Sequence, residues 1–437
     1  MYDILISGGI IMLNVTIELL KKQYGFTDET IELYNKAIVD IEGEFKKYDE
    51  IREYNQLKVL KAFQEERISD SHFTNSTGYG YGDIGRDTLD LVYARIFNAE
   101  KALVRPHFVN GTHALGTALF GNLRPGDTIL AVTGSPYDTL HSVIGISGEE
   151  NIGSLKEYGV NYKQVDLIDG KINIEKALEM IKEDDKIKLI HMQRSTGYGW
   201  RNAFQVEELG KAIKAIKELR EDLIVFVDNC YGEFIDIIEP TDVGADLIAG
   251  SLIKNIGGGI APTGGYIVGK EKYVEQASYR LTVPGIGAEC GCTFGVMKDF
   301  YQGLFLAPHV AIEALKGAIF CARIMELAGF EVLPKYNDKR SDIIQAIKFN
   351  DKEKLIKFCK GVQYASPIDS FVECEPWAMP GYSDEVIMAA GAFIQGSSIE
   401  LSADAPIREP YIAYLQGGLT FDHAKIGVLI ALNNIFK

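Results

Sequence analysis

The sequence predicts an α/β fold in which helices cover both faces of a mainly parallel sheet. Apolar runs of strand length alternate with amphipathic helical segments between residues 108 and 268, and this alternation is typical of a parallel sheet. The helix expected over Val206–Leu219 has clean 3.6-residue spacing and leads into the apolar run 223–227. With 437 residues, 46% of them hydrophobic, the chain can bury a large core in two or three domains.

The elements follow in order after a helical N-terminal arm, which we expect over residues 1–74. A large α/β domain is expected over 75–310 and a smaller C-terminal α/β domain over 311–437. In the large domain we expect helices at 88–98, 114–120, 174–182 and 206–219, and strands at 128–132, 162–167, 188–192, 223–227 and around Leu247 and Ile267. In the C-terminal domain we expect helices at 310–327 and 423–435 and short strands at 370–374 and 399–402.

The overall charge limits the possible partners. A net charge of −16 and a pI near 5.0 argue against a nucleic-acid or membrane partner. The six cysteines have no disulfide-scaffold spacing, and Cys290-Gly-Cys292 has no His/Cys pair at zinc spacing, so we expect a cytoplasmic protein without a metal site. Residues 2–15 are apolar but broken by glycine and lack a basic start. They predict neither a signal peptide nor a membrane span, and Met12 is a possible alternative start.

In such a sheet, ligands bind at the carboxyl ends of the strands, where His113, Tyr137, Arg194, Asp228 and Lys254 are all expected. Lys254 follows an apolar run and Ser251, and a glycine cluster, Gly257 to Gly259, comes next. A lysine in a dry pocket that lowers its pKa could form an imine with pyridoxal phosphate (PLP). The plain alternative is a surface lysine on a glycine loop.

Three other positions fit the same cofactor. Asp228 closes an apolar run, where a carboxylate is costly unless it meets a cation such as a protonated pyridine nitrogen; it could instead cap a turn. Gly111-Thr112-His113 begins a helix, where N–H groups favour phosphate, or where Thr112 simply caps the helix. Tyr137 could stack on a cofactor ring or belong to the core.

The segment 75–86 contains a formal GxGxxG at Gly80, Gly82 and Gly85. A dinucleotide fingerprint needs a preceding strand, and the residues before Gly80 are polar and helical. We therefore expect its tyrosines and Arg86 to touch an anion or an aromatic ring, unless the segment is a simple surface loop. Its sequence Ser-Thr-Gly-Tyr-Gly-Tyr81 is repeated as Ser-Thr-Gly-Tyr-Gly-Trp200.

Taken in chain order, the set resembles the fold-type I PLP enzymes of the cystathionine-lyase and methionine γ-lyase superfamily, and most of all their aluminium-resistance branch. Val227-Asp228-Asn229 resembles the strand with the pyridine-binding aspartate, and Ser251-Leu-Ile-Lys254-Asn-Ile-Gly-Gly resembles the lysine motif. The resemblance implies a seven-stranded sheet, PLP as cofactor, and a homodimer or homotetramer with shared active sites. It also implies an internal aldimine on Lys254, phosphate contacts at 111–113 and Ser251, a ring-stacking Tyr137, and Tyr81 lent across the dimer.

Some positions depart from the superfamily pattern. Its Tyr-x-Arg is absent after Tyr81, which leaves Arg86 as a candidate replacement, and Ile253 replaces a threonine. Arg408, in Ile407-Arg-Glu-Pro, is the candidate for binding a substrate carboxylate.

The implied reaction is β- or γ-elimination from an amino acid, a carbon–sulfur lyase reaction, with Lys254 moving the α-proton and Tyr137 or Tyr81 assisting. The alternatives are transamination, aldol cleavage, or a metal-tolerance protein without turnover.

Overall fold

A computed structural model describes residues 14–379, 382 and 384–437. The chain forms two compact units, one of residues 53–308 and one that joins the described residues up to Arg52 with 309–437. This division differs from the expected boundaries, because most of the helical N-terminal segment groups with the C-terminal part. Both boundaries fall inside long helices, α2 (Asp28–Glu65) and α9 (Met297–Leu327). The second lies at Pro308, which has no N–H to donate within the helix.

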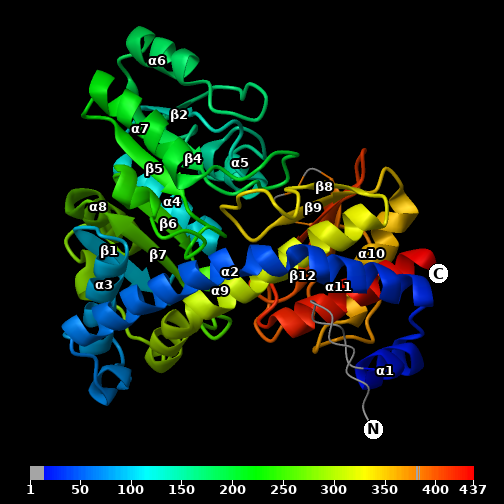
Figure 1. Ribbon diagram of the computed structural model, residues 1–437. Helices are drawn as coiled ribbons and strands as arrows, with labels where there is room; N and C mark the ends of the chain where they lie inside the picture. Colours follow the sequence, from blue (N-terminus) through cyan, green and yellow to red (C-terminus); the bar gives the residue numbers. More distant parts are fainter. Residues whose placement is uncertain (1–13, 380–381, 383) are drawn as a thin grey trace. The chain divides into compact units, whose positions relative to one another are not determined.

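The unit 53–308 contains a seven-stranded sheet in the order β1-β7-β6-β5-β4-β2-β3 (Figure 1). Strands β3, β2, β4, β5 and β6 run parallel, and β7 runs antiparallel to its neighbours β6 and β1. The expected mainly parallel sheet is therefore confirmed. The strands are β1 Lys101–Arg105, β2 Thr128–Ala131, β3 Asn161–Gln164, β4 Ile187–Gln193, β5 Ile224–Asp228, β6 Leu247–Ser251 and β7 Gly265–Gly269.

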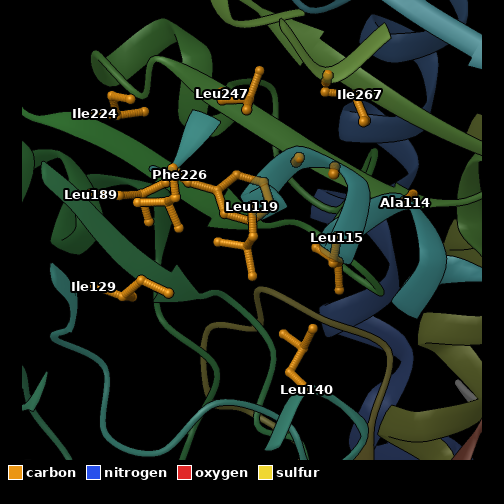
Figure 2. Close-up of a cluster of buried hydrophobic side chains, with 14 of the residues drawn as sticks. Ala114, Leu115, Leu119, Ile129, Leu140, Leu189, Ile224, Phe226, Leu247 and Ile267 are labelled. Carbon is orange, nitrogen blue, oxygen red and sulfur yellow. The ribbon is translucent and has the colours of Figure 1, made fainter. Parts of the chain in front are cut away.

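Helices pack on this sheet and bury its apolar side chains. Figure 2 shows one such cluster, in which Leu115 and Leu119 of α4 lie near Phe226 of β5, and the cluster also includes Leu247 of β6. Helix α4 also crosses α8 closely, since a methyl group at Gly121 would lie 2.8 Å from the Cα of Ala277. The helices are α3 Ile84–Ile96, α4 Gly111–Asn122, α5 Asp138–Ile144, α6 Ile174–Glu183, α7 Val206–Leu219 and α8 Glu271–Leu281, with 3-10 turns η1 Asp70–Phe73, η2 Pro240–Val243, η3 Asn255–Gly257 and η4 Gly287–Glu289.

The other unit contains a six-stranded antiparallel sheet in the order β10-β11-β12-β13-β9-β8. The expected strand at 370–374 is wrong. Phe371 in this segment is 85% exposed, so its apolar residues do not reach a core. The strand expected at 399–402 begins only at Ser402. The elements are α1 Asn14–Tyr24, β8 Glu331–Leu333, β9 Gln345–Lys348, α10 Lys352–Tyr364, β10 Trp377–Ala378, β11 Glu385–Ala389, β12 Ser402–Pro406, β13 Ile412–Gln416 and α11 Phe421–Phe436.

Helix α9 begins earlier than expected, at Met297 rather than near residue 310. Among the described helices it is the one that is long and apolar enough to cross a membrane by length and composition. Within the protein, 78% of its most apolar window is buried, as in a core helix of a globular protein.

Candidate active site

Asp228 ends β5 beside the ends of two neighbouring strands. It pairs in register with Gln193 of β4 and Ala249 of β6, so the three strands present their carboxyl ends together. The carboxylate is buried and accepts a hydrogen bond from the N–H of Cys230 at 3.1 Å. Burial raises the pKa of Asp228, while Lys254 and the Cys230 N–H act in the opposite direction. A further cation at this carboxylate would therefore be stabilised.

Lys254 follows the end of β6 and lies partly buried. Its Nζ is 3.9 Å from the centre of the Tyr231 ring, a cation–π distance. Burial lowers the pKa of Lys254, but the acidic groups of Cys230, Tyr231, Asp228 and Glu233 raise it more, and the net pKa is raised. The expectation of a lowered pKa is wrong, because the acidic groups around the amine outweigh the effect of its burial.

The N-terminus of α4 lies against this pair. A methyl group at Gly111 would be 3.2 Å from the Cβ of Ser251 and 3.6 Å from the Sγ of Cys230, so only glycine lets the helix approach so closely. Asn110, not Thr112, caps the helix by accepting the N–H of His113 at 2.8 Å. The N–H groups of Gly111 and Thr112 have no intrahelical acceptor and are positioned to bind an anion.

The side chains near this helix end have further partners. The Thr112 hydroxyl is 2.8 Å from that of Thr139 at the start of α5. The Nδ1 of His113 accepts the N–H of Val109 at 3.1 Å, and burial lowers its pKa. The Oγ of Ser251 accepts the N–H of Ile253 at 3.3 Å. His113 thus brings its main-chain N–H to the helix end, while its ring is tied to the preceding strand connection.

Tyr137 lies beside the second copy of the repeated sequence Ser-Thr-Gly-Tyr-Gly, residues 195–199. Its ring centre is 5.5 Å from that of Tyr198, and a methyl group at Gly197 would lie 3.4 Å from its Cδ2. Both copies form the same tight turn: Gly80 donates to Thr77 O, and Gly199 donates to Thr196 O, each at 3.1 Å. The repeat is therefore a local conformational match between loops, which places Tyr198, a residue the sequence did not single out, near the site.

The segment 75–86 is held against residues 289–292. The Arg86 guanidinium is buried and donates to Gly80 O at 2.8 Å and to Gly291 O at 2.9 Å. A methyl group at Gly80 would lie 2.7 Å from Gly291 O. Arg86 therefore ties two loops together. Among the described residues no strand comes directly before Gly80, since η1 and a coil occupy that position, so the strand that a dinucleotide fingerprint needs is missing there.

Tyr81 lies on the surface formed by these loops. Tyr79 and Tyr81 stack at 5.4 Å and are 70% and 69% exposed. A hydrogen bond that the Tyr81 hydroxyl donates to Cys290 favours the neutral phenol and raises the pKa of Tyr81. Within the described chain, the two rings present an aromatic surface to the solvent.

The loop after β5 contributes two residues that sequence reasoning missed, Tyr231 and Glu233. A buried ion pair between Arg194 and Glu239 at 2.9 Å anchors the loop, and Asn255 donates to Tyr231 O at 2.9 Å and to Glu233 O at 3.2 Å. Both residues follow Asp228 within the run Asn-Cys-Tyr-Gly-Glu. Acidic and aromatic residues shortly after the aspartate at the strand end were the signal available in the sequence.

The glycine cluster after Lys254 has a packing role. A methyl group at Gly258 would lie 2.3 Å from Gly303 O, and one at Gly303 would lie 2.3 Å from Gly257 O. The cluster lets the lysine turn contact the backbone of α9, which fixes the position from which Lys254 projects.

Arg408 belongs to the other compact unit, after β12. It forms an ion pair with Asp384 at 2.7 Å and its side chain is 47% exposed. Its expected role toward a substrate carboxylate stays a prediction. No group of three or more His, Cys, Asp or Glu side chains among the described residues is arranged to hold a metal ion.

These residues fit PLP in chemistry and in order. An acid buried at a strand end suits a ring cation, a glycine-walled helix N-terminus suits a phosphate, and Lys254 supplies the amine. The space that a side chain at Gly111 would fill is kept open between Ser251 and Cys230.

Known proteins show the same fold and family. The family model for methionine gamma-lyase matches residues 30–436. A Clostridium acetobutylicum structure, provisionally assigned as a cystathionine beta-lyase involved in aluminum resistance, is 70% identical, covers 97% of this chain and 99% of its own, and has a TM-score of 0.94. A carbon-sulfur lyase involved in aluminum resistance from Clostridium novyi NT is also 70% identical, covers 97% and 100%, and has the same TM-score, 0.94.

A more distant structure shows the fold alone. The pyridoxal-5'-phosphate dependent protein YhfS from Escherichia coli is 14% identical, covers 87% of this chain and 95% of its own, and has a TM-score of 0.57. The architecture is thus that of fold-type I PLP enzymes. The family model matches most of the sequence, and this family is one of PLP-type, lyase-like proteins. The chain belongs to the methionine gamma-lyase family.

Proposed function

We propose that the protein is a PLP-dependent carbon–sulfur lyase that eliminates a β- or γ-sulfur substituent from an amino acid and releases ammonia and a keto acid. The observation that carries the proposal is the meeting of a buried acid, Asp228, with the amine of Lys254 beside the N-terminus of α4. The carbon-sulfur lyase name of the 70% identical relative supports the choice of reaction.

Each residue has a defined part in this proposal. Asp228 would hold the ring nitrogen of PLP, the N–H groups at 111–113 and the Ser251 hydroxyl would hold its phosphate, and Tyr137 would pack against its ring. PLP, when bound, stores the electron pair left after the α-proton departs. Lys254 would attach the cofactor, and once a substrate amine has displaced it, its Nζ would accept the α-proton as the sulfur substituent leaves.

The substrate carboxylate is assigned to Arg408, whose planar guanidinium matches that anion. Binding there would require the guanidinium to exchange Asp384, its present partner, for the substrate. Because that ion pair is half-exposed, it is weak, and the exchange costs little.

We also propose a homodimer or homotetramer in which Tyr81 completes a neighbour's site. The stacked, exposed pair of Tyr79 and Tyr81 supports this proposal, since adjoining exposed rings form a continuous apolar surface of the kind that marks interaction sites. Arg86 then acts by fixing the loop that presents them. We place the enzyme in the cytoplasm, where its six unpaired thiols would stay reduced.

The direct test is an absorbance scan of the purified protein incubated with PLP. We expect a band near the edge of the visible range that is absent in Lys254→Ala. A colourless wild type that carries no PLP by mass would reject the proposal.

The reaction itself is tested by screening sulfur amino acids for keto-acid release. Release without any added keto-acid acceptor indicates elimination. Release that depends on an acceptor indicates transamination, and a loaded protein that releases nothing would favour a role without turnover.

A further inference from the structure

A second buried carboxyl, that of Glu233, lies beside the lysine pocket and has no part in the chemistry described above. Glu233 is fully buried. Its Oε1 accepts the Tyr266 hydroxyl at 2.7 Å, while its Oε2, among the described residues, has no hydrogen-bond partner. A buried carboxyl that is only half satisfied is costly.

The fold holds this carboxyl firmly. The Tyr266 ring stacks on Phe97 at 5.6 Å and packs against Tyr93 at 5.9 Å. A methyl group at Gly250 would lie 2.8 Å from Glu233 Oε1 and 2.7 Å from the Tyr266 ring. Gly250, on the strand that leads to Ser251 and Lys254, therefore has no side chain at the point where the Glu233 carboxyl packs.

Glu233 is also linked to the lysine turn. Asn255, the residue after Lys254, donates to the main-chain oxygen of Glu233 at 3.2 Å. Lys254 and Glu233 interact electrostatically in both directions: the amine lowers the pKa of the acid, and the acid raises the pKa of the amine. The charge on one group therefore depends on the charge on the other.

Packing alone does not require an acid at this position. The Tyr266 hydroxyl would be accepted equally well by the amide oxygen of a glutamine, without the burial of a titratable group. A carboxyl differs from an amide in that it can lose a proton as the neighbouring amine of Lys254 gains one.

We propose that Glu233, held by Tyr266, is a positioning residue that sets the pH range over which the nitrogen of Lys254 keeps its proton. The inference rests on the proposed role of Lys254. The titratable groups that face Glu233 are Tyr266 from β7, Tyr93 from α3, Cys230 and Glu239 from its own loop, and Lys254. Of these, Lys254 is the cation, so it is the group that gains when Glu233 ionises.

The burial of Glu233 raises its pKa to about 8, against hydrogen bonding from Tyr266 and attraction by Lys254. Ionisation of Glu233 thus falls in a working range of pH. Removal of the carboxyl should let the nitrogen of Lys254 lose its proton at a lower pH.

The experiment is a pH titration of the absorbance band of the full-length protein loaded with PLP. In Glu233→Gln, which keeps the volume and the acceptor for Tyr266, we expect the midpoint to fall by about one pH unit, a tenfold change in the proton equilibrium. In Tyr266→Phe we expect a smaller fall in the same direction, because Glu233 loses a bond that favours its ionised form.

The matched control is Asp246→Asn, which removes a buried carboxylate at the opposite end of β6. Its midpoint should match that of wild type. A Glu233→Gln midpoint equal to wild type, or an equal fall in Asp246→Asn, would overturn the inference. If Glu233→Gln does not fold, an unmoved Tyr266→Phe midpoint overturns it. A wild type without any band rejects the proposed function instead, so the two failures are distinguishable.

Discussion

Asp228 and Asp246 are two buried aspartates at opposite ends of neighbouring parallel strands, and they differ in how their charge is balanced. Asp246, just before β6, forms ion pairs with Lys217 at 2.6 Å and Lys270 at 2.7 Å and accepts the Val225 N–H at 2.7 Å. Asp228, at the end of β5, has one N–H bond and the nearby Lys254.

The difference separates a sheet edge whose buried acid is paired within the fold from the edge that we propose binds the cofactor. At the amino end of the strands, the charge of the acid is balanced within the chain. At the carboxyl end, an acid is buried short of partners, which is a cost that a bound cation can offset.

The comparison can be tested by neutralising one of the two aspartates at a time, and we expect the largest effect at Asp228. Asp228→Asn should lower keto-acid release by roughly 10²–10³-fold, because the ring nitrogen loses its counter-ion, a loss like that of a preorganised charge partner. Its unfolding midpoint in urea should change little. Steady-state assays and urea titrations of the same preparations measure both quantities.

Asp246→Asn should give the reverse pattern. It leaves Lys217 and Lys270 without their shared carboxylate, and we expect a loss of about 2–3 kcal/mol in the free energy of unfolding. Activity per folded, PLP-loaded molecule should be near that of wild type. If Asp246→Asn lost activity as Asp228→Asn does, the distinction between the two edges would fail.

The next effect tests how tightly the binding edge is packed. Gly250→Ala would put a methyl group 2.7–2.8 Å from the Tyr266 ring and the Glu233 carboxyl. We expect a loss of about 2 kcal/mol from overpacking. Gly126→Ala is not a suitable control because its φ is 96°. Gly43, in α2 with open space around its Cα, is suitable, and Gly43→Ala should be neutral or stabilising.

A third test concerns the pH dependence of stability. The pKa of Glu233 is raised by burial to about 8, far above that of an unfolded glutamate. The folded state therefore holds the proton more strongly. The stability this contributes is fully present below the unfolded pKa and is lost as pH rises toward and through about 8. Urea unfolding at pH 7 and pH 9 should show a loss of about 1–2 kcal/mol in the free energy of unfolding that is reduced in Glu233→Gln. An equal loss of stability between the two pH values in wild type and in Glu233→Gln would contradict the assignment of this loss to Glu233.

The smallest expected effect tests whether one chain supplies all the residues of its cofactor site or needs Tyr81 from a neighbouring chain. Tyr81→Ala should leave the unfolding of the chain nearly unchanged, since the ring is 69% exposed. If a neighbour uses the ring, PLP affinity should fall by about tenfold, or 1.4 kcal/mol. Tyr158→Ala, at a ring 58% exposed, is the control. Equal PLP affinity in both variants would argue that Tyr81 serves no cofactor site.

Much of the large unit could be predicted because its signals are local. The helix Val206–Leu219 was predicted from its apolar positions, since one clean apolar face spans its whole length. Strand β1 was missed because Lys101–Arg105 is short and directly follows a helix. The strand expected at 370–374 failed because an apolar run does not reveal whether a core is available to it.

The site residues also differ in this way: those with local sequence signals could be predicted, and those defined by distant contacts could not. The order of Gly111, Tyr137, Asp228 and Lys254 along the chain indicated the cofactor, because each closes a strand or opens a helix. The role of Arg86 could not be predicted: its partners, Gly80 O and Gly291 O, include a carbonyl from a distant part of the chain. The raised pKa of Lys254 was missed for a similar reason, since Tyr231 and Glu233 reach it only after their loop has folded.

The ammonium form of Lys254 has a consequence for the newly made protein before it meets its cofactor. An ammonium group is a poor nucleophile, so we expect the empty chain to react slowly with stray aldehydes and cyanate in the cell. The ammonium must first lose a proton before the amine can attack the correct aldehyde, so loading should quicken in alkaline buffer. The same acids that shield the amine from chemical damage would thus make cofactor uptake report the pH of its surroundings.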